Sequence, residues 1–321
     1  MIHKKRKKPR KLEFNEACLC RTPVGHPQIP VILKDIARKE AGYYGEQRLD
    51  TILEYLPDKD YHIFQGIRLA NEKGFQFQID DLILTPTYIL IIEAKNMAGK
   101  LDFDQTCDQL VQNDEIGYED PILQAQFQLR EFKNWLRKHQ FPDLPMEYLV
   151  MMSNKNCVLK IEPGSEAQYR VCRGRSVIHR IEAFTRRYQT VKYPPEMIRK
   201  LCKLLLKKDI EPYYDIEKIY KISRSSLPTG VQCPSCKCFA MEYKRGLWHC
   251  STCGVTSRNA HIKALRDYYL LIGPMITNQQ LREFLHLNSP DIAQKKFKKL
   301  NLPSSGKNRH LVYQLSLEKL H

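Results

Sequence analysis

The chain has 321 residues, a length that suits about two domains. Hydrophobic residues make up 42% and charged residues 27%, which permits a packed core and excludes a wholly disordered chain. Lysine and arginine total 52 against 36 aspartates and glutamates. The net charge of +16 excludes an acidic protein and favours a polyanionic partner, either nucleic acid or an anionic membrane surface.

The positive charge is concentrated at the two ends of the sequence. Residues 1–12 carry seven basic side chains and no acidic ones, and residues 221–321 carry 16 basic and 5 acidic side chains. Residues 13–220 have a net charge of −2. We expect residues 1–14 to form a basic tail, either solvated or in contact with a polyanion, and the C-terminal third to hold a binding surface.

The sequence shows no pattern for membrane insertion or secretion. The longest apolar stretch, residues 79–94, contains Asp80, Asp81 and Pro86, and no apolar segment follows the basic N-terminal residues. Of the eleven cysteines, five gather in residues 233–253, which favours a reducing compartment with one metal site over a disulfide framework. We expect a cytoplasmic protein without a membrane partner.

The hydrophobic patterns predict an α/β fold over residues 15–220, with a central mixed sheet flanked by helices. The expected elements, in chain order, are a helix at 34–56, strands at 61–69, 75–84 and 88–95, a helix at 121–139, strands at 147–153 and 169–172, and helices at 176–188 and 194–208. Gly42 and Gly45 interrupt the first helix, which indicates close packing or the close approach of a ligand.

Polar residues interrupt two otherwise apolar strands. Alternation places Asp80 on the face opposite Phe77, and it places Glu93 and Lys95 on one face of the next strand. Asp81 is in phase with the apolar residues, so we favour Asp80, unless a bulge exchanges the two. Two carboxylates can bind Mg²⁺, and a neighbouring lysine can orient a water molecule and stabilise charge on a phosphate. Surface charges at strand ends are the ordinary alternative.

Four motifs in these elements resemble the NERD (nuclease-related) domain of the PD-(D/E)XK nuclease superfamily. They are Gly42-Tyr43-Tyr44-Gly45-Glu46, Gln78-Ile79-Asp80, Ile92-Glu93-Ala94-Lys95-Asn96 with Gly99, and Pro121-Ile122-Leu123-Gln124. Two positions depart from the pattern that is frequent in the family, Asp120 for asparagine and Ala94 for threonine, and neither is a metal position.

The resemblance implies a restriction-endonuclease-like core that cleaves DNA with Mg²⁺. It assigns the metal carboxylates to Asp80 and Glu93, the catalytic lysine to Lys95 and an accessory carboxylate to Glu46. Gln78 and Gln124 match positions that line the site.

Two Cys-x-x-Cys pairs, Cys233/Cys236 and Cys250/Cys253, predict a structural tetrahedral Zn²⁺ site in a zinc ribbon over residues 228–256. Cys238 and His249 are the possible substitute ligands. A redox function is the alternative for such pairs, but no thioredoxin pattern accompanies them. Trp248 and the basic residues near it either contact nucleic acid or are solvated.

Residues 257–321 read as three helices and a hairpin, an order that looks like a winged helix-turn-helix. The helices are expected at 257–272, 277–286 and 289–300, with a basic hairpin tip at 304–309. The candidate DNA-binding residues are Lys295, Lys298, Lys299, Lys307 and Arg309. A small helical cap that stabilises the chain end is the alternative.

The sequence therefore predicts a Mg²⁺-dependent DNA nuclease whose zinc ribbon, winged-helix-like module and basic tail hold the substrate. Two alternatives stay open. One is a DNA-binding protein that uses an inactive nuclease fold as a scaffold, and the other is an RNA-directed factor. A regulatory adaptor that uses the ribbon for protein contacts is a third possibility.

Overall fold

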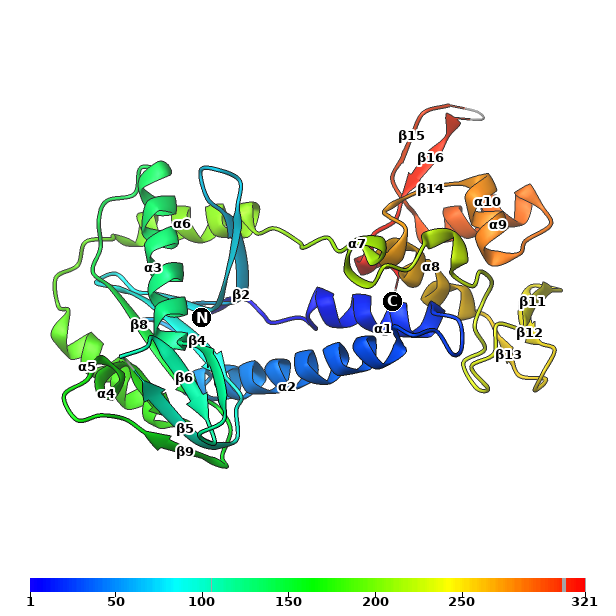
Figure 1. Cartoon of the computed structure of the whole chain (residues 1–321). Helices are drawn as coiled ribbons and strands as arrows, with labels where there is room; N and C mark the ends of the chain where they lie inside the picture. The colour runs from blue at the N-terminus through cyan, green and yellow to red at the C-terminus, as the bar shows by residue number, and fades with distance from the viewer. Residues whose placement is uncertain (105, 308–309, 321) are drawn as a thin grey trace. The chain divides into compact units, whose positions relative to one another are not determined.

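The computed structural model describes residues 1–104, 106–307 and 310–320 (Figure 1). The chain forms two compact units. The first unit contains Met1–Lys8 and Lys39–Glu211, and the second contains Pro9–Arg38 and Pro212–His321. This division differs from the predicted one, in which residues 15–220 made up one domain after a tail.

Two segments account for the difference. Residues 2–4 form strand β1 (Ile2–Lys4), which pairs with a strand of the first unit. Helix α1 (Arg10–Arg21) buries Phe14 and Cys18 in the hydrophobic core of the second unit. The predicted basic tail is thus built from a strand and a helix, because its apolar residues find partners far along the chain.

The first unit contains a mixed six-stranded sheet, as predicted. Its strands follow the order β1, β2 (His62–Ala70), β3 (Gln76–Leu84), β4 (Ile89–Lys95), β8 (Met146–Met152) and β10 (Val171–Arg173). The β2–β3 and β3–β4 pairs are antiparallel, whereas the β1–β2, β4–β8 and β8–β10 pairs are parallel.

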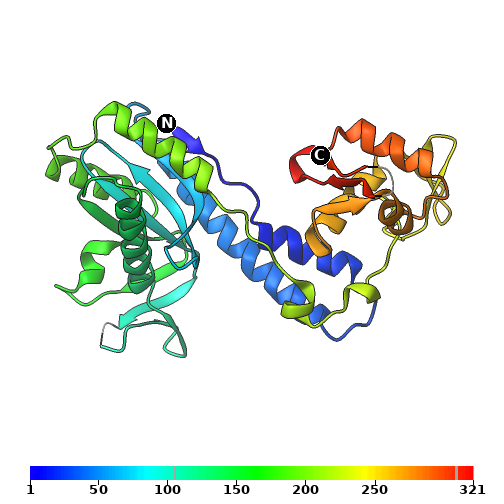
Figure 2. The same cartoon turned by 90° about the horizontal axis from the view of Figure 1, so that it is seen from above.

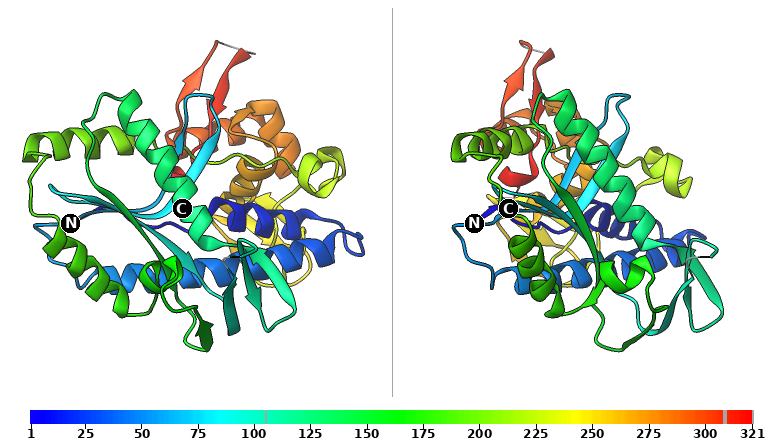
Figure 3. Two further views of the ribbon diagram at one scale, coloured as in Figure 1. Left: turned by 60° about the vertical axis from the view of Figure 1, so that its left-hand side comes forward. Right: turned by 90° about the vertical axis from the view of Figure 1, so that its left-hand side faces the viewer.

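Helices cover both faces of this sheet (Figure 3). Helices α3 (Pro121–Lys138) and α6 (Pro195–Lys208) pack on one face, in a hydrophobic cluster that includes Phe77, Ile91 and Phe132. Helix α5 (Ser176–Arg187) and the end of α2 (Ile29–Leu53) pack on the other, in a cluster that includes Leu49 and Ile92. The result is a helix–sheet–helix sandwich with its core on both sides of the sheet.

A second, four-stranded sheet in this unit is absent from the prediction. It consists of β7 (Ile116–Glu119), β6 (Gln109–Gln112), β5 (Gly99–Asp104) and β9 (Cys157–Lys160), in that order. These strands are short and largely polar, so their sequence carries little period-two signal. Helix α4 (Glu166–Arg170) likewise occupies the start of the strand expected at 169–172.

The second unit combines helices with two small antiparallel sheets (Figure 2). After α1, the start of α2, α7 (Ile216–Tyr220) and η1 (Arg224–Ser226), it contains β11 (Met241–Lys244), β12 (Leu247–Cys250), β13 (Thr256–Ser257), α8 (Ala260–Leu271), β14 (Met275–Thr277), α9 (Asn278–Leu285), α10 (Pro290–Leu300), β15 (Ser304–Ser305), β16 (Val312–Gln314) and η3 (Leu317–Lys319). Strand β14 is an addition to the predicted elements, and it pairs with β16.

No helix within the described ranges is both long enough and apolar enough to cross a bilayer.

Candidate active site

The end of the β3–β4 pair brings Asp80, Glu93 and Lys95 together. The last paired residues of these strands are Asp81 and Ile92, so Asp80 and Glu93 lie just beyond the regular ladder. The Asp80 carboxylate accepts a hydrogen bond from the backbone N–H of Ala94 at 3.1 Å. The Lys95 ammonium lies 2.8 Å from the Glu93 carboxylate. Two carboxylates and one ammonium group therefore lie together where these two neighbouring strands leave their shared ladder.

Asp81 does not follow the expected alternation. Phe77, Ile79 and Leu82 belong to one hydrophobic cluster, so two residues rather than one separate Ile79 from the next side chain on that face. Asp81 lies opposite Ile92, which belongs to the cluster on the other face of the sheet. The expectation that Asp81 is in phase with Phe77 is therefore wrong, because the alternation is interrupted at the two aspartates.

Helix α3 contributes amides to the cluster. Asp120 caps the helix by accepting a hydrogen bond from Ile122 at 2.8 Å, and Pro121 occupies its first turn. One turn further, Gln124 Oε1 accepts a hydrogen bond from Lys95 Nζ at 2.6 Å. The next turn places Gln128, whose Nε2 donates to Glu93 at 2.7 Å. Gln124 thus contacts the cluster, while Gln78, on β3, has an exposed side chain.

Arg6 enters the same region from the segment after β1. Its guanidinium is 5% exposed and forms ion pairs with Glu46 at 2.6 Å, Asp50 at 2.8 Å and Asp81 at 2.7 Å. It also donates to the backbone carbonyl of Asp80 at 2.8 Å. Glu46, expected as an accessory carboxylate, is therefore paired with an arginine.

Sequence reasoning missed three residues of this cluster. Asp50 follows Glu46 by one helical turn, and Gln128 follows Gln124 by one turn, so helical spacing from the known motifs could have found both. No local signal could have found Arg6, since its partners are 40 or more residues away.

Burial and crowding of negative charge perturb the acids. Burial, followed by the charge of Asp80, raises the pKa of Glu93 to about 7. Burial and the charges of Asp80 and Glu93 raise the pKa of Glu46 to about 7, although Arg6 opposes this shift. Complete burial raises the pKa of Asp81 well above its usual value, again against Arg6. The charges of Asp80 and Glu93 thus act on Glu46, and the charge of Asp80 acts on Glu93.

The cluster contains more negative than positive charge. Five carboxylates, two guanidinium or ammonium groups and two amides meet here, so the formal charge with every group ionised is −3. Oxygen donors in excess of cations are what a hard divalent ion such as Mg²⁺ requires. The residues present therefore fit such an ion, and Asp80 and Glu93 are the carboxylates that would hold it.

Close groups of three or more ligand atoms occur elsewhere in the described part of the chain. Ligand atoms within 4.8 Å of one another form two groups there, one of four cysteines and one of His3, His62 and Cys202. The Glu46, Asp80 and Glu93 set is more open than these groups. Water molecules would complete the shell of a cation held by Asp80 and Glu93, as is usual for Mg²⁺.

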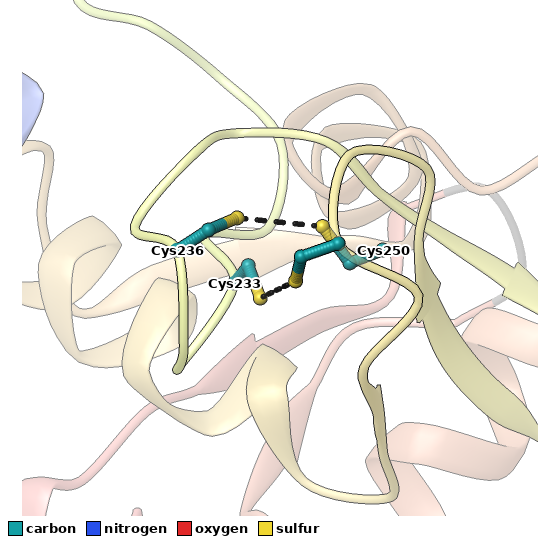
Figure 4. Close-up of side chains that lie close together, drawn as sticks. Cys233, Cys236 and Cys250 are labelled. Atoms are coloured by element: carbon teal, nitrogen blue, oxygen red, sulfur yellow. Dashed lines mark hydrogen bonds between the residues drawn. The ribbon is translucent and has the colours of Figure 1, made fainter.

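The four predicted zinc cysteines come together in the second unit. The Cys233 and Cys253 sulfurs lie 3.6 Å apart, as do those of Cys236 and Cys250 (Figure 4). A tetrahedral site with Zn–S bonds of about 2.3 Å requires sulfur–sulfur distances of roughly 3.8 Å. The sulfurs are therefore arranged to hold Zn²⁺, and Cys238 is exposed outside the set.

Trp248 is part of the core of this ribbon rather than of its surface. Its side chain is fully buried, and its indole N–H donates to His261 at 3.1 Å. Lys296 of α10 covers the neighbouring Tyr243 ring, 4.2 Å from its centroid. The interpretation of Trp248 as a nucleic-acid contact is thus wrong, since packing and a hydrogen bond account for it.

Comparisons with known proteins bear on the first unit. An uncharacterized protein of Bacillus anthracis is 23% identical to the chain over 118 residues, which cover 36% of this chain and 55% of that relative. The chain therefore matches about half the length of this curated relative. No solved structure gives a significant match. Residues 41–153 match the family model of the nuclease-related domain, NERD, so the resemblance carried by the four motifs is confirmed.

Proposed function

We propose that this protein is a Mg²⁺-dependent deoxyribonuclease whose second unit holds the DNA. The observation that carries the proposal is the meeting of Asp80, Glu93 and Lys95 at the edge of the sheet within a nuclease-related domain. The accessory role of Glu46 and the site-lining role of Gln78 and Gln124 are part of the proposal.

Each residue of the site has a distinct role. Asp80 and Glu93 would hold the divalent cation, which when bound supplies Lewis-acid stabilisation of charge on the phosphate. Lys95, fixed by Glu93 and by Gln124, presents a cation beside the phosphate and orients the attacking water. Gln128 restricts Glu93 to one rotamer, and Arg6 holds Glu46 near Asp80. Preorganisation of this kind lowers the reorganisation cost in the transition state.

The second unit offers a basic surface on α10. Ser289 caps this helix, Pro290 begins it, and Lys295, Lys298 and Lys299 follow with exposed side chains. These three lysines are three and four residues apart, so they share one face of the helix. Lys307 is exposed in the adjoining loop, whereas Arg309 lies outside the described residues. Such a stripe suits sequence-independent contact with phosphates.

The arrangement of these elements supports a winged-helix-like module. Three helices accompany the antiparallel sheet β14–β16–β15, which provides the hairpin that the sequence predicts. In the proposal, α10 lies against duplex DNA and the hairpin contacts the backbone. The zinc ribbon supplies a rigid platform for α10 through Tyr243 and Lys296.

Cleavage of supercoiled and linear DNA in the presence of Mg²⁺ tests the proposal. Wild type is compared with Asp80→Asn, Glu93→Gln and Lys95→Ala, and with Glu119→Gln as a control, because Glu119 is an exposed acid in the same unit. We expect wild type and the control to cleave, and each of the three site variants to lose at least a hundredfold in rate while still binding DNA.

Three results would contradict the proposal. Equal cleavage by all variants would mean that a contaminating nuclease is responsible. Absence of cleavage by wild type, with DNA binding intact, would favour the scaffold alternative. Preferential binding or cleavage of RNA at matched salt would replace the proposed substrate.

A further inference from the structure

We propose that His3, His62 and Cys202 form a second metal site, which binds Zn²⁺ or a similar borderline divalent cation and ties strand β1 to the body of the first unit. This site is separate from the four-cysteine site and from the carboxylate cluster. It does not depend on the proposed nuclease activity.

The geometry of the three donor atoms supports metal binding. The His3 Nε2 and His62 Nδ1 atoms lie 2.8 Å apart. The Cys202 sulfur lies within 4.8 Å of a ring nitrogen of each histidine. Tetrahedral Zn²⁺ with bonds of about 2.0 Å to nitrogen and 2.3 Å to sulfur requires its donors to lie roughly 3.3 to 3.6 Å apart. To hold the ion, the two nitrogens would have to separate by about half an ångström, and the sulfur would have to approach them by up to roughly 1.2 Å.

Three separate elements supply the donors. The parallel pairing of β1 and β2, with Ile2 opposite Ile63, brings His3 next to His62. Cys202 comes from α6, which packs on the same face of the sheet as Phe64. The His3 ring stacks on Phe64 at 5.3 Å between centroids, and this contact orients the imidazole. A site assembled from a strand pair and a helix is well defined before any ion binds.

The chemistry of the set favours Zn²⁺ over Mg²⁺. Two imidazoles and one thiolate are borderline-soft ligands, and three protein ligands leave a fourth position for water. Both rings are half-buried, which leaves a route for the ion, while the thiol is buried.

The proposed ion has a structural consequence for the carboxylate cluster. His3 precedes Arg6 by three residues, and Arg6 joins Glu46, Asp50 and Asp81. An ion that fixes His3 to His62 and Cys202 would limit fraying of β1 and so keep Arg6 in place. Strand β1 consists of Ile2–Lys4, too short to be held firmly by its ladder alone.

Zinc stoichiometry of the untagged full chain tests this inference. The protein is stripped with a chelator, reloaded with Zn²⁺, passed through a desalting column and analysed by mass spectrometry of the metal. We expect two zinc ions per chain for wild type and one for His62→Gln and for Cys202→Ala. Cys172→Ala is the control, since Cys172 is buried in the same unit but belongs to neither ligand group, and it should keep two.

A measurement on wild type keeps the inference testable if a variant fails to fold. Ring ¹⁵N resonances of His3 and His62 should shift on addition of the second equivalent of Zn²⁺, and the melting temperature of the first unit should rise. One zinc per chain in wild type would overturn the site. A second zinc that survives both substitutions, or unshifted His3 and His62 resonances, would also overturn it.

Discussion

Arg6 balances more buried negative charge than any other side chain in the carboxylate cluster. It contacts three carboxylates, among them Asp81, whose side chain is fully buried. One oxygen of Asp81 has no hydrogen-bond partner in the described structure, so the arginine is the main compensation for this acid. Removal of one partner from a buried pair leaves an uncompensated charge, which is strongly destabilising.

We therefore expect Arg6→Ala to lower the free energy of unfolding of the first unit by about 3–5 kcal/mol, measured by urea denaturation. Lys5→Ala, at an exposed neighbouring position, should change it by less than about 0.5 kcal/mol. The double variant Arg6→Ala with Asp81→Asn should recover part of the loss, since the buried charge is gone. An Arg6→Ala protein as stable as wild type would contradict this account.

The raised pKa values of Glu46 and Glu93 predict a pH dependence of metal binding. Below about pH 7 Glu93 is protonated in the absence of a cation, and its proton must leave before its oxygen can act as a ligand. Glu46, whose charge acts on the same region, titrates in the same range. The apparent affinity for Mn²⁺, used as a probe of the Mg²⁺ site by electron paramagnetic resonance, should thus rise between pH 6 and pH 8.

Glu46→Gln provides the matched comparison for this pH profile. It removes a negative charge that faces Glu93, so the pKa of Glu93 should fall and the rise in affinity should begin at lower pH. Equal Mn²⁺ affinity at pH 6 and pH 8 in wild type would contradict the prediction.

Gly42 and Gly45 of helix α2 belong to one motif but differ in the space around them. A Cβ added at Gly45 would lie 2.6 Å from Ser153 Oγ and 2.7 Å from Asn96 Cβ, whereas one added at Gly42 would meet nothing within 4 Å. Close packing, one of the two explanations that the sequence suggested for these glycines, therefore applies to Gly45. The contact lets the helix approach the strand ends that carry the cluster.

Substitution by alanine should consequently have opposite effects at the two positions. Gly42→Ala should raise the free energy of unfolding by up to about 1 kcal/mol, because alanine favours the helix. Gly45→Ala should lower it by about 1–3 kcal/mol, since overpacking outweighs helix propensity. Thermal and urea unfolding measure both, and stabilisation by Gly45→Ala would contradict the packing argument.

At the scale of the molecule, we expect zinc and packing to share the stabilisation of the second unit. Trp248 lies two residues before Cys250 and contacts His261 of α8. Removal of zinc from the four-cysteine site should release the ribbon strands and expose this indole. In a Trp135→Phe background Trp248 is the sole tryptophan, because the chain has two.

The tryptophan fluorescence of the Trp135→Phe protein tests this prediction. The emission maximum should shift to the red on chelation, and Cys250→Ser should show the shifted spectrum from the start. Cys238→Ser should behave as the parent, since Cys238 is exposed and outside the ligand set. An unchanged spectrum after complete zinc removal would mean that packing alone maintains the ribbon.

The basic stripe on α10 predicts how the affinity for DNA depends on salt concentration. If Lys295, Lys298 and Lys299 each neutralise a phosphate, replacing all three by alanine should reduce the slope of log affinity against log salt by about 2–3. The matched control is replacement of Lys192, Lys200 and Lys203, which belong to the first unit. DNA affinity with an unaltered salt slope would show that α10 does not contact the backbone.

Local sequence patterns were sufficient to predict many features of this molecule. The apolar runs of β3 and β4, the helical periodicity of α3 and the spacing of Cys233, Cys236, Cys250 and Cys253 are properties of short segments. Each of them could be recognised because helices, strands and metal-binding turns impose regular spacings on neighbouring residues. The Asp80, Glu93 and Lys95 cluster followed from two adjacent strands and a shared edge.

The remaining features depend on contacts between residues that are far apart in sequence. The basic neighbours of Arg6 predict a tail that is either solvated or in contact with a polyanion, yet Arg6 pairs with acids 40 to 75 residues away. His3 and Cys202 are far apart in the sequence, and the pairing of β1 with the sheet brings them together. Helix α1 belongs to the second unit because Phe14 and Cys18 find their apolar neighbours there. Strand register and helix packing decide such contacts, since their free energy comes from burial that no short segment contains.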